Sequence, residues 1–281
     1  MFKRIYLEIT SVCNLACSFC PGTGRPPRFL SPAEFRTLAG KLRPHTRYLY
    51  LHVMGEPLLH PELGELLTIA GALDFRVCLT TNGTLLPERG EGLLAAPCLH
   101  KVSVSLHSFE GNDRRDDLAA YVDGALDFCG RAAGKGVICA LRLWNTGGAD
   151  RRNGEIEERL SARFGTDVRT LPRDGNGSRR LAENVYLESA ERFDWPDPAA
   201  PERATQFCHA LTQQIAVLCD GTVVPCCLDG EGRIPLGDLF AQELDEILAS
   251  PRAQAMRAGF AARRPTEELC RRCGYAARFN K

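Results

Sequence analysis

The sequence predicts an α/β fold in which helices cover a parallel sheet. From residue 1 to about residue 170, short apolar runs alternate with longer stretches of helical periodicity. The short runs are largely apolar on both faces, which is typical of parallel strands buried between helices. Because the crossovers between parallel strands are right-handed, such a sheet either curls toward a barrel or is doubly wound.

The expected elements alternate along the chain. Strands are expected at 4–10, 48–54, 76–82, 101–107 and 137–143, with a weaker run at 167–172. Helices are expected at 31–43, 61–73, 86–95, 116–134 and 154–164. The first helix has a clear start signal, because Ser31 can act as N-cap, Pro32 fits the first turn and Glu34 completes a capping box.

The alternation ends near residue 172. Residues 173–205 are rich in Gly, Pro, Asn and Arg, so they are expected to form a connector. Residues 214–229 predict a hairpin with a turn at Asp220-Gly221, and 241–258 predict a helix. We therefore expect a core domain at 1–172, a connector at 173–205 and a small C-terminal domain at 206–281.

Composition indicates a soluble globular protein. Of 281 residues, 44% are hydrophobic and 25% are charged, and 35 basic residues balance 35 acidic ones. This balance provides no net field to favour nucleic acid or an anionic membrane. Residues 1–10 lack the features of a signal peptide, and no stretch is long enough to span a bilayer. We expect a cytoplasmic protein with no nucleic-acid or membrane partner.

Thirteen cysteines are many for a reducing compartment, where metal binding explains them better than disulfides. Three lie near the start of the chain, and six lie beyond residue 207. The other four lie in apolar segments and are expected to be small buried side chains: Cys78, Cys98, Cys129 and Cys139.

The front cysteines, Cys13, Cys17 and Cys20, follow directly on the first expected strand with the spacing C-x3-C-x2-C. They therefore lie at the carboxyl end of that strand, the edge where parallel α/β sheets bind ligands. Three thiolates are one fewer than a zinc site or a fully protein-held iron-sulfur cluster needs. A [4Fe-4S] cluster held by three thiolates keeps one iron open to a small molecule.

This spacing resembles the signature of the radical S-adenosylmethionine (SAM) superfamily, in which the open iron binds the amino and carboxylate groups of SAM. Phe19 matches the aromatic position of that signature. Residues 54–57, "MGEP", are similar to the family's GGE motif, with Met54 in its first place. The resemblance implies that Gly55 and Glu56 receive the amino group of SAM.

The ends of later strands extend the resemblance. The third strand ends in "TTNG", residues 80–83, a recurrent ending in the superfamily, and Ser105 stands where relatives contact the methionine carboxylate or ribose. The resemblance implies a partial (β/α)6 TIM-like barrel. Its implied SAM contacts are Phe19, Gly55, Glu56, Thr80, Asn82, Ser105, Arg142 and Asn145. No catalytic residue is assigned beyond one candidate, His107, for which a structural role is the alternative.

The rear cysteines resemble the SPASM and twitch extensions of this superfamily. Cys208, Gly221 and Cys226 match C-x9-15-G-x4-C, and Cys270 and Cys273 supply a second pair. The glycine suits a tight turn because it tolerates positive φ. Four thiolates can fully ligate one auxiliary [4Fe-4S] cluster, so the resemblance implies these four cysteines as its ligands.

Three questions about the rear set stay open in the sequence. Cys227 could replace Cys226 as a ligand, although the x4 spacing favours Cys226, and Cys219 is expected to be structural. Two cysteine pairs would also suit a zinc ribbon. A full SPASM domain adds further cysteines, whereas Phe279 occupies the next expected position, so the shortened twitch form with one auxiliary cluster is expected.

The resemblance implies reductive cleavage of SAM to a 5′-deoxyadenosyl radical, which abstracts a hydrogen atom from a substrate C–H bond. An external electron donor of the flavodoxin or ferredoxin type would supply an electron to the front cluster. If the product is an oxidised closed-shell molecule, one more electron must leave, and the auxiliary cluster could accept it. The activity expected is that of a radical SAM oxidoreductase.

Three functions remain open. The first is oxidation of a small metabolite such as an aminoglycoside-like alcohol, which is favoured because the first strand begins near residue 4, without a preceding peptide-binding module. The second is a maturase that cross-links or oxidises a peptide or protein side chain. The third is a non-enzymatic iron-sulfur or zinc-binding structural protein.

Overall fold

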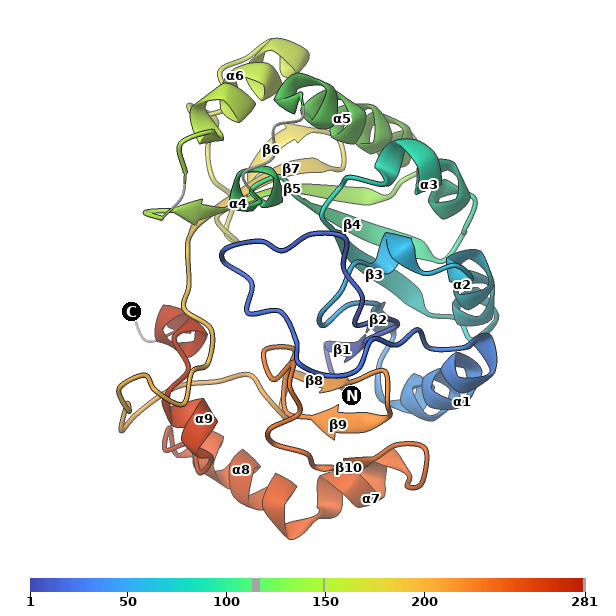
Figure 1. The fold of residues 1–281 in the computed structure, drawn as a ribbon, viewed down its shortest axis with the longest axis vertical. Coiled ribbons are helices and arrows are strands. Elements are labelled where there is room, and N and C mark those ends of the chain that lie inside the picture. Colours follow the sequence, from blue (N-terminus) through green and yellow to red (C-terminus); the bar gives the residue numbers. More distant parts are fainter. Residues whose placement is uncertain (113–116, 149, 280–281) are drawn as a thin grey trace.

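The fold is built on one ten-stranded sheet with the order β10-β9-β8-β1-β2-β3-β4-β5-β7-β6. A computed structural model describes residues 1–112, 117–148 and 150–279. Six neighbouring strands run parallel: β1 Arg4–Leu7, β2 Tyr48–Tyr50, β3 Arg76–Thr81, β4 Leu99–Ser105, β5 Ile138–Thr146 and β7 Val185–Glu191. The sheet curves and carries helices on its outer face (Figure 1). The predicted partial barrel is confirmed.

The connecting helices agree with the sequence prediction to within two residues at each end. They are α1 Pro32–Leu42, α2 Leu63–Ala72, α3 Leu86–Leu94, α5 Leu118–Gly134 and α6 Asn153–Phe164. Residue 116, the expected start of α5, lies outside the described residues. Helix α1 has the expected capping box between Ser31 and Glu34. Three short helices complete this half of the chain: η1 Arg43–His45, η2 Pro57–Leu59 and α4 Ser108–Gly111.

The sixth parallel strand is not where the sequence predicted it. Residues 167–172 form turns and bends, and the strand beside β5 is β7, inside the expected connector. β7 forms an antiparallel pair with β6 Arg179–Ala182. Val185 and Leu187 of β7 enter the core, whereas Tyr186 and Glu188 face the other way. Because only half of this strand is apolar, it lacked the two-faced apolar signal of the earlier strands.

The C-terminal region continues the barrel sheet. β8 Gln214–Val217 and β9 Thr222–Val224 form the predicted hairpin, with Gly221 at φ +90° in its turn. β8 also pairs in parallel with β1, and β10 Gly237–Asp238 pairs with β9. The hairpin therefore belongs to the same sheet as the barrel.

The helix predicted at 241–258 is two helices, α7 Leu244–Ala249 and α8 Pro251–Ala261. Proline lacks the N–H that would continue α7, but it is favoured in the first turn of a new helix. Ser250 caps α8 by accepting a hydrogen bond from the Ala253 N–H at 3.3 Å. α9 Glu268–Arg271 and η3 Tyr275–Phe279 complete the elements. Within the described part of the chain, no helix is long and apolar enough to cross a membrane.

A buried ion pair between Glu8 and Arg25 connects the ends of several strands with the loop that follows β1. The Glu8 carboxylate, with a fully buried side chain, lies 2.7 Å from the guanidinium of Arg25. It also accepts hydrogen bonds from the backbone N–H groups of Met54 and Cys219, each at 3.1 Å. Arg25 in turn donates to the Gly230 carbonyl at 2.7 Å. One carboxylate thus links the ends of β1, β2 and β8 to the loop that follows β1.

Arg25→Met is expected to lower the free energy of unfolding by on the order of 3 kcal/mol, because it leaves the Glu8 carboxylate buried without a counter-charge. The change is measured as the shift in the midpoint of urea-induced unfolding. The double variant Glu8→Gln/Arg25→Met removes the stranded charge and should recover part of the loss. Equal losses in the single and double variants would show that the unpaired Glu8 charge is not the cause of the destabilisation.

Candidate functional site

The front cysteines lie on the loop between β1 and α1, at the carboxyl end of β1 as predicted. Two backbone hydrogen bonds hold the ends of this loop together. The Leu30 N–H donates to the Ile9 carbonyl at 2.9 Å, and the Ser11 N–H donates to the Arg28 carbonyl at 3.2 Å. The cysteines are therefore presented on a closed loop rather than on an extended segment.

The three front thiols are neighbours. Burial, opposed by a hydrogen bond from Asn112 and assisted by the nearby sulfurs of Cys20 and Cys13, raises the pKa of Cys17 to about 11. The Asn112 side chain donates to the Cys17 sulfur at 3.0 Å and accepts from the Ala16 N–H at 2.8 Å. Thiolates this close need a positive partner, which iron supplies. The donor set fits a cluster with three protein ligands.

Gly55 and Glu56 pack against the base of the cysteine loop. Gly55 has φ +73°, and a Cβ at this position would lie 2.4 Å from the Thr10 carbonyl oxygen, so only glycine fits. The Glu56 N–H donates to the Val12 carbonyl at 2.8 Å. The structure thus places the "MGEP" backbone directly beside the cysteine loop.

The Glu56 carboxylate is buried and ties this turn to the end of β3. It accepts from the Thr81 hydroxyl at 2.8 Å and from the Asn82 N–H at 2.7 Å. The Asn82 side chain then donates to the Asn14 side chain on the cysteine loop at 2.8 Å. The side chains of Glu56 and Asn82 therefore position the loop, and their contact with SAM stays a prediction.

Several predicted site residues line one chamber of about 420 Å³ inside the barrel. Those from the sequence analysis are Phe19, Thr80, Ser105, His107 and Arg142. Aromatic side chains complete much of the wall: Tyr6, Tyr50, Trp144, Phe193, Trp195 and Tyr275. The barrel interior is a polar and aromatic cavity at the front cysteine loop, which suits substrate binding.

His107 is neutral and is held by two neighbours. Its Nδ1 lies 3.0 Å from the Arg142 carbonyl oxygen and 3.5 Å from the Trp144 N–H, and the shorter contact, to an acceptor, places the proton on Nδ1. Its ring lies 4.7 Å from that of Phe19, between centroids. Burial lowers the pKa of His107 to about 4. His107 therefore packs against Phe19, and a catalytic role stays a prediction.

Arg142 and Asn145 of β5 have different surroundings. Arg142 lines the chamber, pairs with Glu188 of β7 at 2.9 Å and lies over the Trp144 ring at 4.4 Å. Asn145 is buried, and its side chain contacts those of Glu110 and Asn153. The structure does not bring Asn145 to the chamber wall with Arg142.

The four predicted rear cysteines line one largely apolar cavity: Cys208, Cys226, Cys270 and Cys273. Burial, followed by repulsion from the other cysteines, raises the pKa of Cys226 well above its ordinary value. The buried Gln206 side chain donates to the carbonyls of Cys270 and Cys273, at 3.3 and 3.4 Å, and so holds this pair. The donor set fits a fully ligated cluster.

Cys226 and Cys227 face different spaces. Cys226 lies in the rear cavity, whereas Cys227 lines the chamber and interacts with the Tyr6 hydroxyl. Cys219 is buried against Glu8 and Arg25, as expected of a structural residue. Among the described residues, no group of three or more His, Cys, Asp or Glu side chains is arranged so that it could hold a metal ion.

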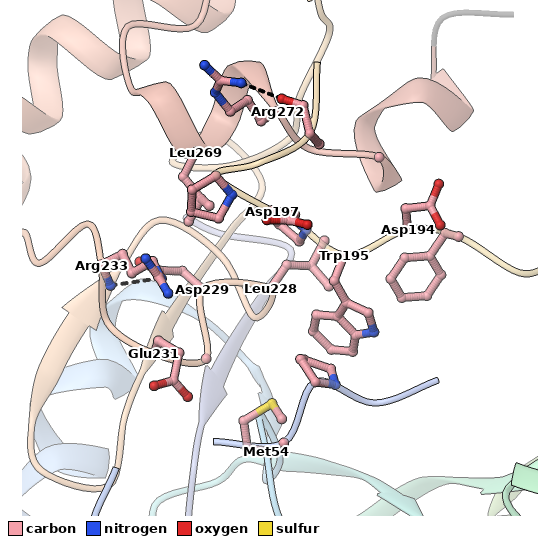
Figure 2. Close-up of a pocket in the computed structure, with 18 of the residues that line it drawn as sticks. Met54, Asp194, Trp195, Asp197, Leu228, Asp229, Glu231, Arg233, Leu269 and Arg272 are labelled. Carbon is pink, nitrogen blue, oxygen red and sulfur yellow. Dashed lines mark hydrogen bonds between the residues drawn. The ribbon is translucent and has the colours of Figure 1, made fainter. Parts of the chain in front are cut away.

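A cleft of about 570 Å³ borders the chamber, and the two share the wall residues Arg192, Phe193, Trp195 and Leu228. Figure 2 shows the Trp195 side chain extending toward Met54, with Asp229 and Arg233 on another wall. The Trp195 indole N–H donates to the Phe19 carbonyl at 2.9 Å. The cleft therefore joins the cysteine loop, the segment after β7 and the C-terminal region.

The residues that hold these parts together were not predicted from the sequence. Glu8, Arg25 and Gln206 act through partners far away in the sequence, so no local motif marks them. Glu8 had one available signal, since it is the acidic residue in an otherwise apolar strand end, "RIYLEIT". A charge in a buried strand indicates a buried partner.

Two family models match the chain. The radical SAM superfamily model matches residues 7–145, and the model of the iron-sulfur cluster-binding domain SPASM matches residues 208–274. The first covers the front cysteines and the strands that form the chamber. The second covers the four rear cysteines and favours iron-sulfur over the zinc ribbon.

Curated relatives and a solved structure agree with these matches. GTP 3′,8-cyclase of Stenotrophomonas maltophilia (strain R551-3) is 36% identical over 115 residues, 39% of this chain and 35% of the cyclase. Sporulation killing factor maturation protein SkfB of Bacillus subtilis (strain 168) is 27% identical over 267 residues, 86% of this chain and 63% of SkfB. The matches thus span about a third of the cyclase and less than two thirds of SkfB.

The fold is also that of BtrN, solved in complex with AdoMet and 2-DOIA. The two structures superpose with a TM-score of 0.59 at 17% identity, over 97% of this chain and 93% of BtrN. At this identity the likeness shows a common fold and leaves the substrate undecided.

Cys226→Ala is expected to remove about four iron atoms per chain from the anaerobically reconstituted protein, because it removes one of four thiols around the rear cavity. Cys227→Ala is the matched control, since it leaves those four thiols in place, and it should keep the full iron content. Iron and acid-labile sulfide analysis measures both variants. The opposite pattern would make Cys227 the ligand.

Proposed function

We propose that this chain, which belongs to the radical SAM superfamily and carries a SPASM domain, oxidises a substrate by two electrons in the barrel chamber. The observation that carries the proposal is the contrast between the two cysteine sets. Three neighbouring thiols lie on the front loop and four line the rear cavity. Residues adjoining both sets, Phe19 and Cys227, line the same chamber.

Under this proposal Cys13, Cys17 and Cys20 hold the [4Fe-4S] cluster that binds SAM, and Cys208, Cys226, Cys270 and Cys273 hold one auxiliary [4Fe-4S] cluster. When bound, these groups supply a 5′-deoxyadenosyl radical and an acceptor for a second electron. The chain itself must hold the substrate C–H bond in place and exclude water. The aromatic wall of the chamber suits that task.

Oxidation of an alcohol to a ketone removes one hydrogen atom, one electron and one proton. The proton needs an acceptor, and no aspartate or glutamate is among the described residues that line the chamber. His107 is the candidate, because its Nδ1–H is directed to the Arg142 carbonyl, which leaves the Nε2 lone pair for a proton. Its low pKa keeps this nitrogen unprotonated near neutral pH.

The chamber supports a small-metabolite alcohol as the substrate. Its volume of about 420 Å³ lies in the usual range for small-molecule sites. An aminoglycoside-like alcohol, the substrate predicted from the sequence, is one member of this class. The reaction also needs an external electron donor of the flavodoxin or ferredoxin type.

A peptide substrate is the second candidate, and the cleft in Figure 2 is the observation that favours it. The cleft borders the chamber through shared wall residues, so a peptide lying in it would be close to the barrel interior. SkfB, which matches most of this chain, is named as a maturation protein. Binding of a small peptide encoded beside this gene would favour this candidate over the metabolite.

Anaerobic reconstitution is expected to yield about eight iron atoms per chain, and dithionite reduction with SAM should yield 5′-deoxyadenosine. Cys20→Ala should abolish deoxyadenosine formation, because it removes a ligand of the front cluster. Deoxyadenosine is measured by chromatography in wild type and variant. A wild-type protein with full iron content and no SAM cleavage would contradict the proposed function.

Cys270→Ala tests the role of the auxiliary cluster. It should lose about four iron atoms per chain and still cleave SAM, whereas oxidised product per deoxyadenosine should fall at least tenfold. The matched control is Cys98→Ala, which replaces a cysteine outside both sets. Loss of the second cluster with unchanged product formation would exclude it as the electron acceptor.

A further inference from the structure

We propose that the substrate carries an anionic group, a carboxylate or a phosphate, and that Arg4, Lys101 and Arg142 hold this group inside the barrel. The inference rests on the proposed function and narrows its substrate class. It starts from the charges of the chamber wall. Four basic side chains line the chamber, the fourth being Arg192, and no acidic side chain is among its described lining residues.

The three inner cations lie around Cys78 and Tyr50. Cys78 is paired in register with Tyr50 of β2 and with Lys101 of β4, and Arg4 lies over the Tyr50 ring. The Cys78 thiol lies within electrostatic range of Arg4, Lys101 and Arg142, and it also interacts with the Tyr50 hydroxyl. These residues come from five adjacent strands, β1 to β5, whose inner faces meet in the barrel. An anion beside Tyr50 would therefore face positive charge from several sides.

One carboxylate compensates only part of this charge. Glu188 of β7 pairs with Lys101 and with Arg142, each at 2.9 Å. Arg4 forms no ion pair with any described residue, and its guanidinium lies 5.7 Å from the centre of the Tyr50 ring. A half-buried cation without a counter-ion is costly, so an anionic ligand would be stabilised there.

An unpartnered histidine adds an independent observation. His52 lines the chamber, and its buried Nδ1 has no hydrogen-bond partner among the described residues. Its Nε2 lies 3.1 Å from the Thr80 hydroxyl, which accepts from Arg142 at 3.3 Å. Thr80 can then donate its own proton to Nε2, which puts the ring proton on Nδ1. Such an N–H is a donor that an anionic ligand could satisfy.

Arg142 is also an expected SAM contact, so the position of Arg4 is what separates the anion from the cysteine loop. Arg4 begins β1, whereas the cysteine loop follows the carboxyl end of the same strand. Gly55 and Glu56 lie against that loop. An anion at Arg4 is therefore a substrate group rather than the carboxylate of SAM.

The charges of the chamber wall narrow the class of small metabolites that could be the substrate. The ammonium groups of an amino sugar would lie near Arg4, Lys101 and Arg142. No carboxylate among the described lining residues would balance their charge. Like charges at short range in a partly buried site disfavour binding. The inference therefore favours an acidic alcohol, such as a hydroxy acid or a sugar phosphate, over an amino-bearing one.

The chain offers a direct probe of the chamber. It has two tryptophans, Trp144 and Trp195, and both line this space. The reconstituted protein with saturating SAM is titrated separately with inorganic phosphate, acetate and putrescine at constant ionic strength, and tryptophan fluorescence is recorded. We expect a saturable change with at least one anion and none with putrescine. The tighter of the two anions identifies the phosphate or the carboxylate class.

Arg4→Gln should weaken anion binding at least tenfold, because it removes the cation that lacks an ion pair. Arg36→Gln, on the exposed surface of α1, is the matched control and should bind like wild type. Lys101→Gln is the second variant and should weaken binding in the same direction. Circular dichroism and iron content verify that each variant is folded and loaded.

Saturable binding of putrescine, no response to either anion, or undiminished anion binding in both Arg4→Gln and Lys101→Gln would overturn the inference. Wild-type deoxyadenosine formation is measured in the same preparations. SAM cleavage without anion binding rejects only the anionic substrate. Anion binding without SAM cleavage rejects only the proposed function.

Discussion

The buried ion pair between Glu8 and Arg25 is the constraint on which the arrangement of the site depends. Glu8 lies at the end of β1 and accepts backbone N–H groups from the turns after β2 and β8, while Arg25 brings the cysteine loop to the Gly230 carbonyl. A buried carboxylate must keep its partners, because losing one strands a charge. The Glu8 carboxylate therefore fixes the position of the front loop relative to the C-terminal region.

A second network gives the chamber its electrostatic character. Thr80, Arg142, Lys101 and Glu188 join four neighbouring strands across the barrel interior. The network contains more cationic than anionic groups, and burial keeps His52 and His107 neutral, with pKa values of about 3 and 4. The chamber thus combines fixed positive charge with neutral hydrogen-bonding groups. These are properties of a binding site rather than of a packed core.

Elements with a strong local signal were predictable from the sequence. Helices α1, α2, α3, α5 and α6 follow their periodicity, α1 also follows its capping signal, and the cysteine spacings identified both thiol sets. β7 escaped because it is buried on one face only, and α7 and α8 were merged because the apolar pattern continues across Pro251. In β7 the apolar pattern was too weak to indicate a strand. At Pro251 the apolar pattern indicated one continuous helix, whereas proline ends the first helix and begins the second.

The sequence by itself determined the type of chemistry, since three thiols after the first strand and four later ones set the number of ligands available for iron. Tertiary structure alone decided which side chains share a space. It directed Cys226 to the rear cavity and Cys227 to the chamber, although they are adjacent in sequence. It also gave Glu188 its two cationic partners and left Arg4 with none among the described residues. The reason is physical: cysteine spacing is local, whereas charge compensation depends on strands that become neighbours only when the sheet forms.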